Sequence, residues 1–264
     1  MATDTQAPAV PVEYVSFADR LADAAGQVIR RYFRTPVPID IKADHSPVTA
    51  ADRGAEEVMR GLINAEFPDH GIFGEEFGNE RVDADWVWYL DPVDGTKSFI
   101  TGSAQFGTLI GLAYQGRPVL GVIDQPIQGE RWLGVAGRVT TFNGREIASR
   151  HCDDLSRAVL YSWGAEIFDG ENGAAMRRVN DQVYMARYSA DCYAYGLLSM
   201  GFVDLVIEDG LKPYDYMALA PVVNGAGGLM TDWEGNEILA GGSDRVIAAG
   251  DRQLHAKVRE LLSD

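Results

Sequence analysis

The chain has 264 residues, 46% of them hydrophobic, and can bury a large core in one unit or two coupled ones. Its 39 acidic residues outnumber 23 Lys and Arg, and the net charge of −16 argues against nonspecific binding to nucleic acid or an anionic membrane. The chain has no apolar run near the roughly 18 residues that span a bilayer, and two cysteines make no disulfide framework. We expect a cytoplasmic α/β or α+β protein with a frayed tail over Met1–Pro11.

The first predicted elements are two amphipathic helices with a short strand between them. Apolar residues recur at helical spacing over Glu13–Phe33, and Ile39–Lys42 is the strand candidate. Thr49 is a good N-cap for the second helix, and Asp52 falls in its first turn. An acid there is stabilised by the helix dipole, and on local grounds this interpretation of Asp52 is favoured over a functional one.

Two short stretches carry acids directly after predicted strands. Gly71–Gly74 is an apolar strand that opens into Glu75 and Glu76, and adjacent acids on extended chain point in opposite directions. One of them can then face a site while the other faces solvent or a basic partner. When this stretch is taken alone, an ordinary polar loop is the favoured interpretation.

The second stretch comes after the apolar run Trp86–Leu90, which is typical of a buried strand. Asp91 and Asp94 come three residues apart at its end, Gly95 permits a sharp turn, and Thr96 can cap the next element. Two carboxylates aimed at one point would bind a hard divalent cation. The alternative is a plain Asp-Pro and Asp-Gly turn with a threonine cap, and this decapeptide does not decide between the two.

The rest of the chain is rich in strands at first and mixed later. Consecutive hairpins are predicted over 108–114 with 118–123 and over 131–135 with 139–142. Further strands are expected at 155–163, 202–207, 229–231 and 246–249, and helices at 170–180, 191–200 and 253–262. Asp191 would cap one helix, and Asp215 begins another that is apolar throughout.

Five acids share a position at an element boundary: Asp52, Glu75, Asp91, Asp94 and Asp215. The chain lacks the H-E-x-x-H, G-x-S-x-G, Walker and G-x-G-x-x-G motifs. The scattered, polar-flanked histidines are expected at the surface; they are His45, His70, His151 and His255. An all-carboxylate site suits Mg²⁺ or Mn²⁺ and phosphoryl chemistry.

These motifs together resemble the inositol monophosphatase superfamily of Mg²⁺-dependent phosphomonoesterases. The motifs are G-E-E at 74–76, D-P-V-D-G-T at 91–96, and the Asp215 helix followed by G-A-G-G. The likeness runs from about Val15 to Leu262. Stretches at 96–102, 106–110, 121–126, 130–132, 140–144 and 191–196 are most similar to the branch of histidinol-phosphate phosphatases.

The resemblance implies a role for each motif residue. Glu75, Asp91 and the Val93 carbonyl would bind a first metal, and Asp91, Asp94 and Asp215 a second. Asp52 with Glu75 would support a third, weaker metal and the nucleophilic water, which Thr96 would orient. Backbone amides of Gly95 and Thr96 would hold phosphate oxygens. Asp191, for which a helix cap remains the alternative, and Glu208 would contact the rest of the substrate. Lys42 and Asp44 would act behind the site or in loop closure.

The implied fold is a five-layer αβαβα sandwich, a single phosphatase unit over 1–264 with a metal-binding half at 12–150 and a substrate-side half at 151–264. The implied reaction is hydrolysis of L-histidinol phosphate in histidine biosynthesis by metal-activated water, with two to three Mg²⁺ ions, in a homodimer. The alternatives are an inositol monophosphatase, a broad sugar phosphatase, a nucleotide 3′-phosphatase, or a noncatalytic metal- or phosphate-binding regulatory protein.

Overall fold

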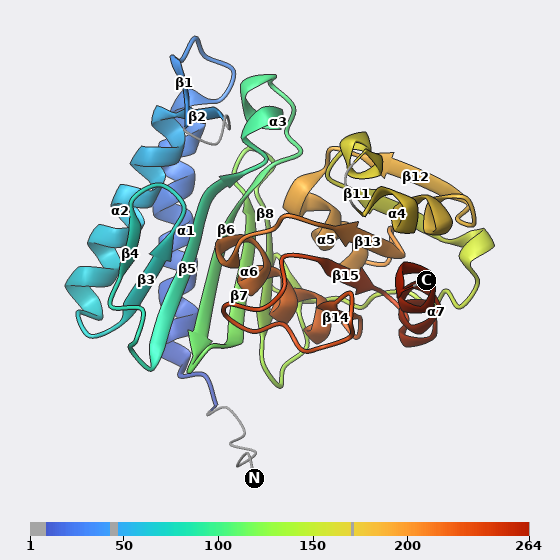
Figure 1. Cartoon of the computed structure of the whole chain (residues 1–264). Helices are drawn as coiled ribbons and strands as arrows, with labels where there is room; N and C mark the ends of the chain where they lie inside the picture. The colour runs from blue at the N-terminus through green and yellow to red at the C-terminus, as the bar shows by residue number, and fades with distance from the viewer. Residues whose placement is uncertain (1–8, 43–46, 170–171, 264) are drawn as a thin grey trace.

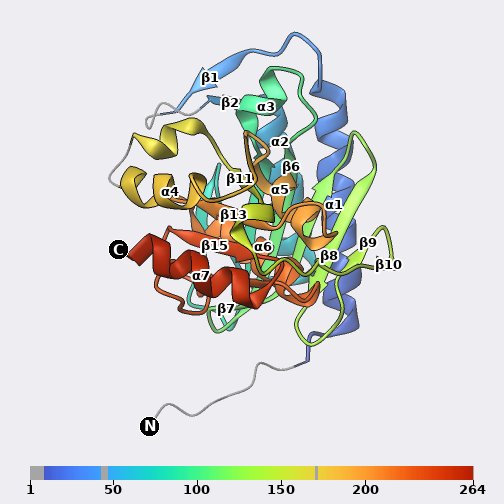
Figure 2. The ribbon, with the colours of Figure 1, turned by 90° about the vertical axis from the view of Figure 1, so that its right-hand side faces the viewer.

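Two large β-sheets alternate with three layers of helices, so the molecule is the αβαβα sandwich that the family resemblance implied (Figure 1). The structure, a computed structural model, describes residues 9–42, 47–169 and 172–263. Figure 2 shows helices α4 (Gly173–Asn180) and α7 (Arg252–Ser263) on the opposite side of the molecule from α1 (Val12–Tyr32), with the sheets and helices α5 (Asp191–Ser199) and α6 (Pro213–Gly225) between them. No helix within these described ranges is long and apolar enough to cross a membrane.

The larger sheet has eight strands in the order β10-β9-β8-β7-β6-β5-β3-β4. It is antiparallel except for the parallel pair β3 and β5, and it contains both predicted hairpins. Its strands are β3 Gly71–Gly74, β4 Gly78–Glu80, β5 Trp86–Asp94, β6 Gly107–Tyr114, β7 Arg117–Gln125, β8 Glu130–Val135, β9 Thr141–Phe142 and β10 Arg145–Glu146.

Helices α1 (Val12–Tyr32) and α2 (Ala50–Glu66) cover the outer face of this sheet. A two-stranded sheet of β1 (Ile39–Ile41) and β2 (Pro47–Thr49) lies between them in sequence. Both helices bury an apolar face against the strands, as their spacing predicted. The tail enters the fold earlier than expected, because Val10 is buried in the same core.

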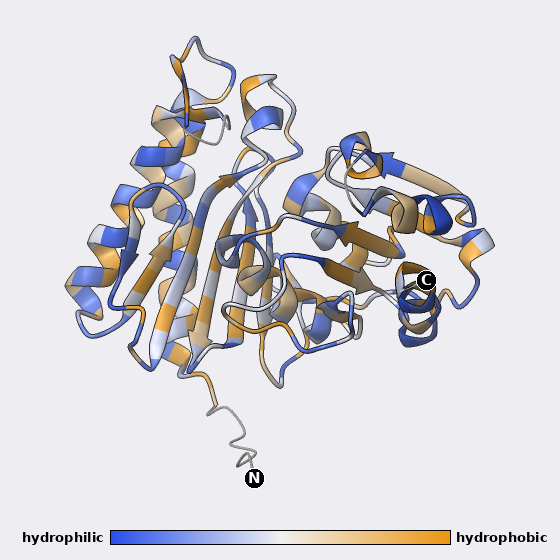
Figure 3. Cartoon of the chain, viewed as in Figure 1, coloured by the Kyte–Doolittle hydropathy of each residue, from blue (hydrophilic) through white to orange (hydrophobic). Residues whose placement is uncertain are grey.

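The smaller sheet has five strands in the order β12-β11-β13-β15-β14, and α4 (Gly173–Asn180) and α7 (Arg252–Ser263) cover its outer face. Its strands are β11 Val159–Ser162, β12 Met185–Tyr188, β13 Leu205–Glu208, β14 Leu229–Asp232 and β15 Val246–Ala249. The central strands β13 and β15 are strongly hydrophobic (Figure 3), as expected for strands covered on both faces. Two predicted strands begin later than expected, because 155–157 forms a 3₁₀ turn and 202–204 lies outside β13.

The middle layer holds α5 (Asp191–Ser199) and α6 (Pro213–Gly225) between the sheets. Three glycines lie side by side on β6, β7 and β8, and α6 crosses directly over them; they are Gly111, Gly121 and Gly134. A Cβ atom on Gly121 would stand 1.9 Å from the Ala218 carbonyl oxygen. The glycines therefore let α6 approach the sheet at backbone distance.

The expectation that the histidines lie at the surface is wrong for two of them. His70 and His255 are buried, and only His151 among the described histidines is exposed. His70 stacks on Phe67 and accepts a hydrogen bond from Trp88 Nε1, while His255 Nε2 lies 2.9 Å from Thr231 Oγ1. His45 lies outside the described residues. Polar flanking residues misled the prediction, because the neighbours that bury both rings come from elsewhere in the chain.

Candidate active site

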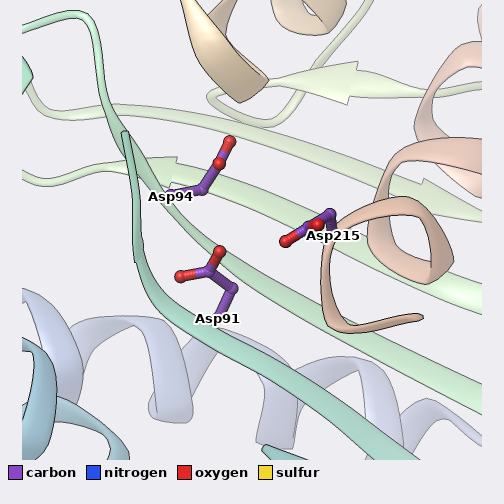
Figure 4. Close-up of side chains that lie close together, drawn as sticks. All are labelled: Asp91, Asp94 and Asp215. Atoms are coloured by element: carbon purple, nitrogen blue, oxygen red, sulfur yellow. The ribbon is translucent and has the colours of Figure 1, made fainter. Parts of the chain in front are cut away.

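Three carboxylates converge where β5 ends and α6 begins. Asp91, Asp94 and Asp215 each offer an oxygen atom, and these atoms lie within 4.8 Å of one another (Figure 4). Residues three apart on a regular strand face opposite sides of the sheet. The pairing of β5 with β6 shifts register between Asp91 and Asp94, and this irregularity turns both side chains toward the same point.

Backbone amides hold one oxygen of each of these acids in place. The carboxylates of Asp91, Asp94 and Asp215 accept hydrogen bonds from the amides of Val93, Cys192 and Lys212, at 3.0, 2.6 and 2.7 Å respectively. The Asp215 contact is part of the N-terminal capping of α6. The cluster thus depends on three separate segments, and within the described part of the chain no cationic side chain forms an ion pair with these three acids.

The crowding of these acids is electrostatically costly. Burial, together with neighbouring carboxylates, raises the pKa of Asp91 and Asp94 well above the ordinary value. Burial also raises the pKa of Asp215 to about 7, and nearby Glu75 contributes. An all-oxygen donor set that is removed from water and repels itself is the kind that a hard divalent cation stabilises. The residues present therefore fit Mg²⁺ or Mn²⁺.

Glu75 lies at the edge of this cluster, and its carboxylate and that of Glu76 both accept hydrogen bonds from the same lysine. Lys42 Nζ donates to Glu75 Oε1 at 2.7 Å and to Glu76 Oε1 at 2.5 Å. The prediction that Glu75 and Glu76 point in opposite directions is wrong, because the chain leaves the extended conformation after Gly74 and turns. Asp44, expected to act with Lys42, lies outside the described residues.

Asp52 serves both its own helix and the candidate site. Its Oδ2 atom accepts from the Thr49 amide at 2.9 Å and from Thr49 Oγ1 at 2.5 Å, so the predicted cap is present. Its Oδ1 atom lies 3.2 Å from Thr96 Oγ1, which is also 3.1 Å from the Val93 carbonyl. Asp52 therefore stabilises the start of α2 with one oxygen and contacts a residue of the candidate site with the other.

Asp191 is not the helix cap that the local sequence suggested. No side chain caps α5, and Asp191 itself has a φ of 45°, which is unfavourable for a residue with a side chain. Its carboxylate accepts a hydrogen bond from Ser98 Oγ at 3.2 Å, and a Cβ on Gly95 would stand 2.7 Å from its Oδ2 atom. Burial raises the pKa of Asp191 to about 6.

Glu208 lies deeper than Asp191 and already has a protein partner. It is buried at the end of β13 and accepts a hydrogen bond from the Tyr195 hydroxyl at 2.8 Å. Burial raises the pKa of Glu208 to about 8, and the charge of Asp191 adds to the effect. The two acids thus belong to one electrostatic environment, with Asp191 nearer the opening.

A cavity of about 190 Å³ opens beside the acids. It is lined by Pro47, Glu75, Gly95, Thr96, Lys97, Trp163 and Asp191. Four larger hollows, of about 520, 560, 410 and 390 Å³, are lined by other parts of the chain and by none of the site residues. The small cavity is the one lined by Glu75, Thr96 and Asp191, which contact or adjoin the carboxylate cluster.

Two buried charged residues near the site, Glu56 and Arg60, belong to no motif that can be recognised in the sequence. Glu56 on α2 accepts from the amides of Glu76 and Phe77, at 2.7 and 3.1 Å, and from Arg60 Nε at 2.7 Å. Glu56 therefore holds the turn that carries Glu75. Its only sequence signal is its spacing, because Asp52, Glu56 and Arg60 follow one another at four-residue intervals on a buried helix face.

Comparison with known proteins gives concordant matches over nearly the whole chain. Residues 11–264 match the inositol monophosphatase family. The bifunctional phosphatase IMPL2 of Arabidopsis chloroplasts is 51% identical over 94% of this chain and 75% of that protein. A histidinol-phosphatase of Chlorobaculum parvum is 33% identical over 89% of this chain and 91% of its own. The solved structure of an inositol monophosphatase from Zymomonas mobilis is 47% identical, covers 96% of this chain and 98% of its own, and has a TM-score of 0.88.

Proposed function

We propose that this chain, which belongs to the inositol monophosphatase family and is therefore a metal-dependent phosphatase, hydrolyses L-histidinol phosphate to L-histidinol and phosphate. The observation that carries the chemistry is the cluster of Asp91, Asp94 and Asp215, whose oxygens lie within 4.8 Å of one another. This buried, all-oxygen set is the donor set that Mg²⁺ prefers.

The carboxylate-rich wall would hold the cations that the reaction needs. In this assignment Glu75, Asp91 and the Val93 carbonyl bind one Mg²⁺, and Asp91, Asp94 and Asp215 bind a second. Bound divalent cations neutralise the charge of the phosphate and lower the pKa of water. The positions of the three aspartates in the cluster, each with one oxygen already fixed by an amide, support the assignment.

The protein's own groups orient the attacking water and the phosphate. Thr96 Oγ1 can donate its proton to Asp52 at 3.2 Å and accept one from a water molecule in the cavity that Thr96 lines. Asp52, buried and fixed by its cap, would then orient the threonine hydroxyl. The amides of Gly95 and Thr96 at the turn into α3 (Thr96–Ile100) would bind phosphate oxygens.

Asp191 supports the choice of a cationic substrate. Its carboxylate lines the cavity beside Gly95 and Thr96, and Glu208 lies behind it as a further polar group. Histidinol phosphate carries an ammonium group and an imidazole next to its phosphate ester, so acids suit it better than they suit a neutral polyol. The name of one relative, the histidinol-phosphatase of Chlorobaculum parvum, supports the same choice.

Hydrolysis of inositol 1-phosphate is the second candidate. The Zymomonas mobilis structure that is 47% identical to this chain is titled an inositol monophosphatase. Both reactions would use the same acids and differ only in contacts to the leaving group. Placement in histidine biosynthesis, a homodimer and a cytoplasmic location stay predictions based on the family and the composition.

Phosphate release with Mg²⁺ present tests the substrate. L-histidinol phosphate, inositol 1-phosphate and adenosine 3′,5′-bisphosphate should be compared at equal concentration. We expect a strong preference for histidinol phosphate, which EDTA abolishes. A preference for either of the other two would keep the phosphatase and overturn the proposed substrate.

A further inference from the structure

Trp163 is the one aromatic side chain among the described residues that line the cavity beside the acids. It follows β11 and is half-buried, so part of its indole stays accessible. The other lining side chains are proline, charged residues and a threonine, and glycine completes the wall. The cavity therefore has acid groups near the phosphate position and an aromatic surface elsewhere in its wall.

The indole ring is fixed through its polar edge. Trp163 Nε1 donates to Asp209 Oδ1 at 3.1 Å, and Asn172 Nδ2 donates to Asp209 Oδ2 at 3.0 Å. Asp209 directly follows the last residue of β13, the strand that ends in Glu208. A ring whose only hydrogen-bond donor is satisfied in this way presents its apolar faces in a defined orientation.

One face of this ring already meets a cation. The Lys97 ammonium lies 5.9 Å from the centroid of the Trp163 ring, near the outer limit of a cation–π contact. Lys97 is exposed on a flexible side chain, so a ligand can displace it at low cost. Flat rings and cationic groups are the two ligand types that such an aromatic face attracts.

We propose that Trp163 is a specificity-determining residue that stacks on the leaving group, and that the enzyme therefore selects phosphomonoesters whose alcohol carries a flat nitrogen heterocycle. This inference rests on the proposed function, since the imidazole of histidinol is such a ring. In this arrangement Asp191 attracts the positive charge of the alcohol, and the indole face covers its ring. Asp209 is a positioning residue that acts only through Trp163.

Two substrates separate the ring contact from the rest of the site. L-histidinol phosphate and phosphoethanolamine share the phosphate ester and the neighbouring ammonium group, but only the first has an imidazole. We expect W163A and W163L to raise the KM for histidinol phosphate about tenfold and to change kcat/KM for phosphoethanolamine less than twofold. W163F should keep most of the preference, and Y184A, which changes an exposed tyrosine outside the cavity, should match the wild type.

A binding measurement gives a readout that does not depend on turnover. L-histidinol should quench part of the tryptophan fluorescence of the wild-type protein, and W163F should lose that quenching while it retains activity. If the wild type prefers histidinol phosphate and both W163A and W163L keep that preference, the inference is overturned and the proposed function stands. If the wild type shows no preference over phosphoethanolamine, both are overturned.

Discussion

Asp94 is held by the chain on one side and crowded by acids on the other. Its Oδ2 atom accepts from the Cys192 amide at 2.6 Å, while Asp91 and Asp215 lie within 4.8 Å. Removal from water, then the charges of Asp191 and Asp215, raise its pKa. An asparagine at this position keeps the shape and an acceptor for the amide, but it removes the charge that a cation would need.

We predict that D94N lowers turnover by about 100-fold or more, as expected for a lost charge at a reacting centre. The fold should survive, because the substitution relieves repulsion among the acids. Phosphate release and thermal unfolding measure the two effects, and D83N, at an exposed position, is the matched control. Near-normal activity of D94N would show that Asp94 is not a metal ligand.

Because His255 is buried, we predict that the protein loses stability in mild acid. Burial, with Arg259 and Arg252 nearby, lowers its pKa to about 4, whereas the unfolded chain titrates near 6.5. The stability from the neutral ring is complete above pH 6.5 and declines as pH falls from 6.5 toward 4, because the unfolded state takes up the proton first. The loss should approach about 2 to 3 kcal/mol.

Urea unfolding of the wild type and H255Q at pH 7.5 and pH 5 measures this contribution. The wild type should lose more of its free energy of unfolding than H255Q over that interval, since glutamine does not titrate. An equal loss in both proteins would mean that His255 is not held neutral by the fold.

Among the elements, α2 does more than cover the sheet. The Glu56 carboxylate accepts from two amides of the turn after β3, and the same carboxylate neutralises the buried Arg60. A Cβ on Gly74 would stand 2.1 Å from Glu56 Oε1, so the turn fits closely around this acid. Helix and turn are thereby coupled, and Glu75 depends on both.

We predict that E56A costs about 3 kcal/mol of stability, because it leaves two amides without their buried acceptor and the buried Arg60 with the more exposed Glu80 as its ion-pair partner. E57A, the same change at the next and exposed position of α2, should stay within about 0.5 kcal/mol of the wild type. E56A should also raise the Mg²⁺ concentration for half-maximal activity. If the Mg²⁺ concentration for half-maximal activity is unchanged, Glu56 contributes to stability and not to metal binding.

The close packing of α6 on the glycines of β6, β7 and β8 leads to a second prediction. G121A should destabilise the protein by about 2 to 3 kcal/mol and reduce activity, since the new methyl group pushes α6 and Asp215 off the sheet. G61A is the control, because Gly61 lies exposed within α2 with nothing within 4 Å of a new Cβ. It should stabilise by about 0.5 to 1 kcal/mol. Both are measured by denaturant unfolding, and a neutral G121A would refute the close packing.

Over the whole molecule, the sequence predicted elements better than it predicted their environments. The helices and hairpins follow apolar spacing, and the clustered aspartates were recognisable because each ends or begins an element. The turn after Gly74 was missed, since strand alternation was extended too far. Buried polar residues such as Glu56 and His255 were missed because their partners lie on other elements, and spacing within one element does not reveal them.

Asp191 shows the same limit at the junction of the two sheets. Its position before an apolar helix favoured a cap as strongly as a substrate contact, and only the fold reveals its positive φ and its contact with Ser98. The site is built where β5 of the larger sheet meets the starts of α5 and α6. The cavity could therefore not be predicted from the sequence, because the residues that form it are distant in the chain and only the fold brings them together.

The cluster of Asp91, Asp94 and Asp215 should make phosphatase activity depend on a divalent cation. Phosphate release from L-histidinol phosphate by EDTA-treated protein, before and after Mg²⁺ is added, tests this dependence. We predict negligible release before addition and full recovery afterwards, with D94N inactive in both conditions. Release that persists without metal, or no release from histidinol phosphate, inositol 1-phosphate or adenosine 3′,5′-bisphosphate with either Mg²⁺ or Mn²⁺, would show that the cluster is not a metal-dependent phosphatase site.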